Sequence, residues 1–327
     1  MSIIHNYPNI SITQLVYILA VARHQHFGDA AKACGVTQPT LSMQIQKLED
    51  ILDIIVFDRS KKPVMVTQIG REIIDQANII VRETQRIGDI INQTQGNIRG
   101  DFHLGVIPTV APYLLPRFLT NFAQSYPDVR LFVSEQQTDT IVHLLDNGEL
   151  DAGLLATPLA HQGITERPLF YEPFVLYTSP KHPLYKKSTI RETDLHHKDI
   201  WLLAEGHCLR TQVLNLCERR LDQSKDRHVH FDSGSLETLM RLIENGPGYT
   251  LIPHLAAQQI KDTTRKRMLK PFAGSPPTRE ISLVFNRAFL KKATIEALHN
   301  IISSSIPDVL KEKPEHTNQI VRIHPQG

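Results

Sequence analysis

A thiol with polar neighbours is the feature of the sequence that most directly suggests chemistry. Cys208 lies in the stretch Glu205–Arg210, directly after His207 and two residues before Arg210. Nearby positive charge and the positive end of a helix both favour the thiolate, the reactive form of cysteine. Apolar residues follow Cys208 at the spacing of an amphipathic helix, so we expect the cysteine at the start of that helix. These neighbours predict a lowered thiol pKa.

A second cysteine, Cys217, follows nine residues after Cys208. Nine residues of helix rise ~13 Å, whereas a disulfide requires Cα atoms about 4.4–6.8 Å apart. The two sulfurs therefore cannot bond while both lie on one intact helix. This spacing indicates a bond that forms only when the helix partly unravels, as in a switch.

Two other interpretations of these cysteines remain open. Isolated cysteines are usually small, buried, apolar residues without a chemical role. Zinc binding is the other alternative, and its candidate ligands are His207, Cys208, Cys217, His228 and His230. Their spacing lacks the compact pairs that are typical of zinc sites, so we expect no metal and no cofactor.

Length and composition restrict the class of protein. A chain of 327 residues has room for two or three domains. Three cysteines, no secretory leader and no apolar run long enough to span a bilayer predict a cytoplasmic protein without membrane contact. The formal net charge of +2 does not favour any class of partner.

Residues 1–66 are predicted to form an all-α, winged helix-turn-helix domain that binds double-stranded DNA. Gly35 permits a tight turn between two short helices, and Thr37 with Pro39 begins the second of them. The apolar residues of this second helix face inward, which leaves amides and hydroxyls to contact base edges in a major groove. The residues expected to contact DNA there are Gln38, Pro39, Thr40, Ser42, Gln44 and Gln46.

A basic turn follows between two short apolar stretches, residues 55–57 and 64–66. This strand–turn–strand pattern is typical of a wing, and its cations Arg59, Lys61 and Lys62 are expected to contact phosphates. A surface hairpin with solvated charges is the alternative.

Residues 67–96 are predicted to form a long linker helix. Residues spaced alternately by four and three form the seam of a coiled coil: Ile73, Ala77, Ile80, Thr84, Ile87 and Ile91. One helix alone leaves such a stripe exposed, so a second copy of the chain is its simplest partner. A homodimer in turn fits a palindromic operator.

Strands and helices alternate from residue 97 to 305, the rhythm of a parallel α/β sheet. Its recurrence predicts two α/β lobes joined by two crossings, with a cleft between them. Ligands of such folds bind beyond the carboxyl ends of strands, so we expect Thr109, Thr138 and Cys208 to converge. Residues 306–327 are polar and are expected to be a flexible tail.

The N-terminal segment resembles the winged helix-turn-helix of LysR-type transcription regulators, through Ala30-Ala31, Val36–Ser42 and Gln44–Glu49. The C-terminal half is similar to the effector domain of the same regulators, which has two lobes like a periplasmic binding protein. The resemblance implies transcription regulation together with RNA polymerase.

Further motifs are similar to those of the hydrogen-peroxide sensors within this family. They are Gly105–Val110, Pro112–Pro116, Gly206–Arg210 with Gln212 and Cys217, Ser235–Leu239 and Gly248–Pro253. This similarity implies that Cys208 reacts with peroxide and that Cys217 resolves the product into an intramolecular disulfide. It implies that Thr109, Thr138, His207 and Arg210 surround the peroxide. It also implies a homotetrameric activator of the oxidative-stress response that thioredoxin-like or glutaredoxin-like dithiols reset. The chain departs from the pattern at Thr211, where aspartate is common, and at Asp232–Gly234.

Two other functions compete with peroxide sensing. A LysR-type regulator could bind a small metabolite between the lobes, with both cysteines structural. A thiol peroxidase or other redox enzyme is the second, but an enzyme needs neither a wing nor a dimer seam. We therefore expect a regulator and not an enzyme.

Overall fold

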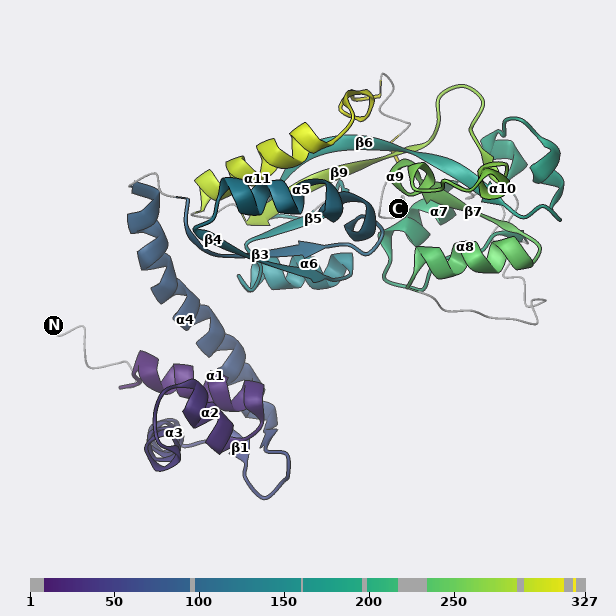
Figure 1. The fold of residues 1–327 in the computed structure, drawn as a ribbon. Coiled ribbons are helices and arrows are strands. Elements are labelled where there is room, and N and C mark those ends of the chain that lie inside the picture. Colours follow the sequence, from purple (N-terminus) through teal and green to yellow (C-terminus); the bar gives the residue numbers. More distant parts are fainter. Residues whose placement is uncertain are drawn as a thin grey trace. The chain divides into compact units, whose positions relative to one another are not determined.

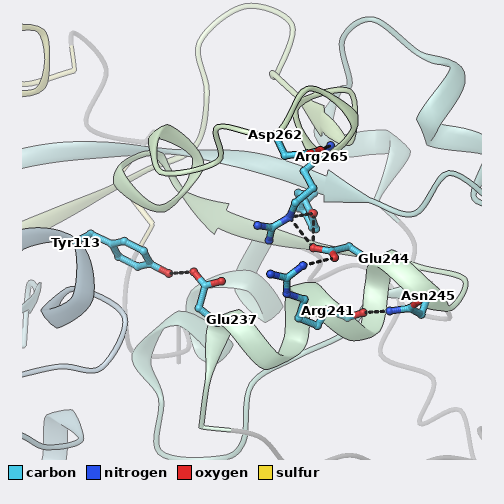
Figure 2. A network of polar contacts seen from close by, with 8 residues as sticks. Tyr113, Glu237, Arg241, Glu244, Asn245, Asp262 and Arg265 are labelled. Atoms are coloured by element: carbon cyan, nitrogen blue, oxygen red, sulfur yellow. Dashed lines mark hydrogen bonds and ion pairs between the residues drawn. The ribbon is translucent and has the colours of Figure 1, made fainter.

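The computed structural model describes residues 9–94, 98–159, 161–195, 199–216, 234–286, 291–314 and 320–321. The chain divides into two compact units, Met1–Thr94 and Gln95–Gly327 (Figure 1). No helix within the described ranges is both long and apolar enough to span a membrane.

The first unit is a winged helix-turn-helix, as predicted. Gly35 adopts a φ of +68° at the turn, which few other residues tolerate. The Thr37 side chain accepts a hydrogen bond from the Thr40 amide and caps the following helix. The elements are α1 (Ile12–His24), α2 (Phe27–Ala33), α3 (Gln38–Leu52) and the antiparallel strands β1 (Phe57–Asp58) and β2 (Met65–Val66) of the wing.

The linker helix α4 (Gln68–Thr94) divides its predicted seam between two roles. Ile73 and Ala77 pack into the core of the first unit, because α4 lies against α1. Ile80 and Ile87, further along, are 40% and 61% exposed. The first part of the stripe therefore serves its own domain, and the later part leaves apolar surface uncovered.

The second unit contains a seven-stranded mixed sheet, which confirms the predicted α/β class. The strand order is β4-β3-β5-β9-β6-β7, with β8 also paired to β6. Helices α5 (Ala111–Ser125) and α11 (Lys292–Ser305) lie on one face of the sheet and α6 (Thr138–Asp146) on the other (Figure 1). The strands are β3 (Gly100–Val106), β4 (Val129–Glu135), β5 (Ala152–Thr157), β6 (Ile164–Thr178), β7 (Tyr249–Pro253), β8 (Leu269–Lys270) and β9 (Thr278–Asn286).

Strand β6 joins the two lobes. Its first part pairs with β9, and its last residues pair with β7 and β8 of the second lobe. Sequence patterning did not predict this strand, because Pro168 and Pro173 interrupt it and a bulge lies between Pro168 and Phe170. The second lobe also holds α7 (Cys208–Leu216), α8 (Leu236–Asn245), α9 (His254–Gln258) and α10 (Thr263–Lys266).

Two local expectations differ from the structure. The predicted alternation of strands and helices is incomplete before α7, where Ile200 forms a single bridge with Tyr249. The flexible tail expected from residue 306 does not hold for Ile306, Leu310 and Val321, which are 3%, 2% and 8% exposed. Their apolar side chains pack against the core of the second unit, and this burial outweighs the polar composition around them.

Candidate functional site

Cys208 is the first residue of α7 and is 5% exposed. The loop before it packs on the loop before α6, because Gln137 Nε2 donates to the Glu205 carbonyl at 3.4 Å. Gly206 makes this approach possible: its φ is +85°, and a Cβ there would lie 2.3 Å from Gln137 Oε1. Packing between these loops brings the thiol to the first turn of α6.

Thr138, the first residue of α6, lies next to that thiol. Its side chain favours the thiolate of Cys208. Its hydroxyl oxygen is nevertheless buried without a well-formed hydrogen bond to any described residue, so the contact with sulfur is a weak one. An unsatisfied buried hydroxyl is costly, and a small polar molecule beside it would gain a strong hydrogen bond.

Arg279 on β9 supplies the buried positive charge of the site and is fully buried. Its Nη1 donates to Thr109 Oγ1 at 3.0 Å, and its Nη2 donates to the Thr109 carbonyl at 3.1 Å. Its Nε and Nη2 also donate to Glu172 Oε2 at 2.9 and 2.7 Å. The other oxygen of Glu172 accepts the Leu255 amide at 2.6 Å. These contacts hold the guanidinium in one orientation.

The electrostatics of the thiol differ from the prediction. Burial raises the pKa of Cys208, and the charge of Arg279 opposes that rise. Burial lowers the pKa of His207, so its imidazole is neutral at pH 7. Arg210 is bound to the loop before α7, with its Nη1 donating to the Leu203 carbonyl at 2.9 Å. The prediction that His207 and Arg210 lower the pKa of Cys208 was wrong. The cation that acts on the thiol is Arg279, which comes from a strand distant in the sequence.

The predicted peroxide-surrounding residues therefore separate into two groups. Thr109 and Thr138 lie around Arg279 and Cys208, as topology predicted. His207 lies instead against Gly234, where a Cβ would be 3.2 Å from its Nε2.

Sequence reasoning missed Glu172 and Arg279, although a signal existed. Each is a charge within an apolar strand, and a buried charge requires an opposite partner.

Several candidate residues lie outside the described ranges, namely Cys217, His228 and His230. Within the part of the chain that the structure describes, no three His, Cys, Asp or Glu side chains are grouped closely enough to hold a metal ion. Cys34 and Cys208 are free thiols.

On the first unit, α3 presents the predicted polar face. Gln38, Pro39, Thr40 and Gln46 are exposed, and Ser42 and Gln44 are half-buried. The wing lysines Lys61 and Lys62 are exposed as well.

Arg59 of the wing differs from these lysines because it bonds within the protein. It donates to Glu49 Oε2 at 2.8 Å and to Ser42 Oγ at 3.3 Å, and it lies 5.1 Å over the Phe27 ring. These contacts join the wing to α3 and hold the Arg59 guanidinium, whose side chain is still 37% exposed.

Comparison with known proteins covers both units. Residues 12–71 match the family described as bacterial regulatory helix-turn-helix protein, lysR family. Residues 95–306 match the LysR substrate binding domain.

Individual relatives extend over nearly the whole chain. The DNA-binding transcriptional dual regulator OxyR of Escherichia coli (strain K12) is 36% identical over 296 residues, 90% of this chain and 95% of that protein. The hydrogen peroxide-inducible genes activator of Haemophilus influenzae is 34% identical over 302 residues, 92% of this chain and 99% of that protein.

Solved structures of OxyR proteins are also similar to this chain. A full-length OxyR variant from Pseudomonas aeruginosa has a TM-score of 0.72 and 32% identity, covering 90% of this chain and 98% of that one. An H2O2-bound mutant of Corynebacterium glutamicum OxyR has a TM-score of 0.60 and 28% identity, covering 91% and 92%. With its helix-turn-helix, its two-lobed α/β domain and these relatives, the chain belongs to the lysR family of bacterial transcription regulators, in the OxyR group.

Proposed function

We propose that this protein is a DNA-binding transcription regulator that senses hydrogen peroxide through Cys208. The observation that carries the proposal is the placement of that thiol, on the first turn of α7, between the fixed guanidinium of Arg279 and the buried hydroxyl of Thr138. The names of its relatives, hydrogen peroxide-inducible genes activators, support the same effector.

The proposed reaction begins when the Cys208 thiolate attacks one oxygen of the peroxide. The S–O bond forms as the O–O bond breaks, and the other oxygen leaves as hydroxide, which takes up a proton to become water. Sulfur is oxidised to a sulfenic acid and the peroxide is reduced. Arg279 stabilises the leaving oxygen, and the Thr138 and Thr109 hydroxyls orient the peroxide.

The second step is a disulfide between Cys208 and Cys217. The Cys217 thiolate attacks the Cys208 sulfur and expels the sulfenic oxygen as hydroxide, which leaves as water after protonation. Cys208 is buried on an intact helix that ends at Leu216, so α7 must unravel for the two sulfurs to meet. That rearrangement is the switch, and a thioredoxin-like or glutaredoxin-like dithiol resets it.

The output of the switch is DNA binding by α3 and the wing. In this proposal the exposed stripe with Ile80 and Ile87 pairs with a second copy of the chain, and the assembly is a dimer or tetramer on a palindromic operator. His207 and Arg210 support the loop around the thiol rather than contacting the peroxide.

The deciding experiment is peptide mapping of the reduced protein under non-reducing conditions, before and after one equivalent of peroxide. We expect a Cys208–Cys217 disulfide in the wild type and a trapped sulfenic acid at Cys208 in Cys217→Ser. Cys34→Ser is the matched control and should behave like the wild type. A DNA footprint that is the same with and without peroxide would contradict the proposal. So would peroxide-dependent regulation by a variant in which serine replaces both Cys208 and Cys217.

A further inference from the structure

The C-terminal end of the described chain is hydrogen-bonded into the second unit at two places. The Val321 amide donates to the Thr278 carbonyl at 2.8 Å, and Ile320 pairs with Thr278 in a parallel bridge. The Val321 carbonyl accepts from Gln212 Nε2 at 3.0 Å. Ile320 and Val321 therefore connect β9 with α7.

These two attachment points adjoin the thiol site. Gln212 follows Cys208 by four residues on α7, so both side chains leave the same face of the helix one turn apart. Thr278 directly precedes Arg279 on β9. The C-terminal segment thus bridges the helix that carries the thiol and the strand that carries its cation.

The side-chain amide of Gln212 donates its hydrogen bond to the Val321 carbonyl of this segment. Its side chain is fully buried, and the Oε1 atom has no hydrogen-bond partner among the described residues. The amide orientation is fixed, because only the nitrogen can donate to the Val321 carbonyl. Losing that bond would leave a buried amide without its donor contact, which weakens the packing of α7 in this position.

We propose that Ile320 and Val321 form a C-terminal strap that holds α7 in its folded, reduced position and so opposes its unravelling. The strap is a property of the reduced protein, whereas its consequence for peroxide sensing rests on the proposed function. Within that function, the strap must be released before Cys208 can leave Arg279 and meet Cys217. The strap therefore sets how readily oxidation at Cys208 becomes a disulfide.

Hydrogen-exchange mass spectrometry of the reduced, full-length protein tests the strap directly. Val321→Pro removes the amide donor to Thr278. One lost hydrogen bond shifts an opening equilibrium by about fivefold, so we expect exchange in residues 208–216 to be about fivefold faster. Lys313→Pro is the matched control, since Lys313 is exposed and its amide donates to no described residue. Its α7 should exchange at the wild-type rate.

A second variant and a contradicting outcome complete the exchange experiment. If Val321→Pro does not fold, Gln212→Met replaces it, because methionine keeps about the size of the side chain and has no N–H to donate to the Val321 carbonyl. Unchanged exchange in α7 with either variant overturns the strap.

The peroxide response separates the two proposals. With a working strap, Val321→Pro forms the disulfide about fivefold faster, while sulfenic acid formation, measured in a Cys217→Ser background, is unchanged. If α7 exchanges faster but the wild type never forms the disulfide, the strap stands and the proposed function fails. If the wild type forms the disulfide and Val321→Pro changes neither rate, only the strap fails.

Discussion

Both units contain an arginine–glutamate pair that joins two elements, but the two pairs lie in different surroundings. In the first unit Arg59 of the wing meets Glu49 of α3, with side chains 37% and 4% exposed. In the second unit Arg279 of β9 meets Glu172 of β6, with both side chains 1% exposed. Water screens the first pair in part, whereas the second pair is dry. The Arg59–Glu49 pair therefore joins two elements near the surface of the first unit. The Arg279–Glu172 pair fixes a charge in the interior of the second unit.

The two candidate sites differ in the same way. The candidate DNA-reading surface comes from one stretch, residues 37–62, and its polar side chains are largely exposed. The thiol site collects Thr109, Thr138, Glu172, Cys208 and Arg279, which lie far apart in the sequence and are all buried. A local site tolerates loss of one contact, while an assembled, buried site loses its geometry when one partner is removed.

Breaking the buried pair gives the largest expected effect. Glu172→Gln leaves the Arg279 charge unpaired in the interior, which should lower the free energy of unfolding of the second unit by about 3–5 kcal/mol. Urea unfolding followed by the fluorescence of Trp201, the only tryptophan of the chain, measures it.

Glu49→Gln is the counterpart in the first unit. It should cost less, about 1–2 kcal/mol, because Arg59 is partly solvated. Some loss is expected because the amide nitrogen of the new side chain would replace one of two accepting oxygens, which receive the Arg59 guanidinium and the Val56 and Phe57 amides. Hydrogen exchange of peptides from α1 to α3 in the full-length protein follows this change. Equal losses from the two substitutions would remove the distinction between the pairs.

The pH dependence of oxidation tests the raised pKa of Cys208. Only the thiolate attacks peroxide, and its fraction grows about tenfold per pH unit below the pKa. Since burial raises that pKa above the ordinary value of 9.0, oxidation should accelerate about a hundredfold from pH 6 to pH 8. Rapid-mixing measurements of sulfenic acid in Cys217→Ser give the profile. A rate that levels off near neutral pH would show that Arg279 outweighs burial.

A substitution at Gly206 tests whether the contact between the two loops brings Cys208 to Thr138. Gly206→Ala introduces both a strained φ and a Cβ that would lie 2.3 Å from Gln137 Oε1. Gly274→Ala is its matched control, with a φ of +79° and open space around the added Cβ. The control should cost about 1–2 kcal/mol from the backbone alone.

Gly206→Ala should lower the free energy of unfolding by more than that control does, and it should also slow peroxide oxidation. If both alanine variants oxidise at the wild-type rate, the loop contact does not position the thiol.

The smallest expected effect separates Arg59 from the wing lysines. Lys61→Ala removes one exposed charge and should lower the slope of log affinity against log salt concentration by about 0.9. Arg59→Ala should leave this slope nearly unchanged, because that side chain is bound to Glu49 and Ser42. DNA titrations at several salt concentrations measure both slopes. A drop of about 0.9 for Arg59→Ala as well would restore its predicted role at a phosphate.

Sequence patterns predicted well the features that depend on neighbouring residues. They predicted poorly the features that depend on contacts between residues distant in the sequence. The cap at Thr37, the turn at Gly35 and the outward amides of α3 follow from neighbouring residues alone. The proline-interrupted strand β6 and the docked Val321 did not follow, because strand pairing and burial depend on partners distant in the sequence. The pKa of Cys208 was misjudged for the same reason, since His207 and Arg210 are neighbours in sequence but not the cations that face the sulfur.

Patterns along the chain were therefore sufficient to identify the family and the fold class of both units, and they selected α3 as the candidate DNA-reading helix and Cys208 as the candidate reactive residue. Helix caps, turns and hydrophobic periodicity act over a few residues, so their outcome can be read along the chain. The tertiary structure decided which charge acts on the thiol and what holds α7 in place. Those outcomes depend on desolvation and on contacts between distant strands, and neither is fixed by local spacing.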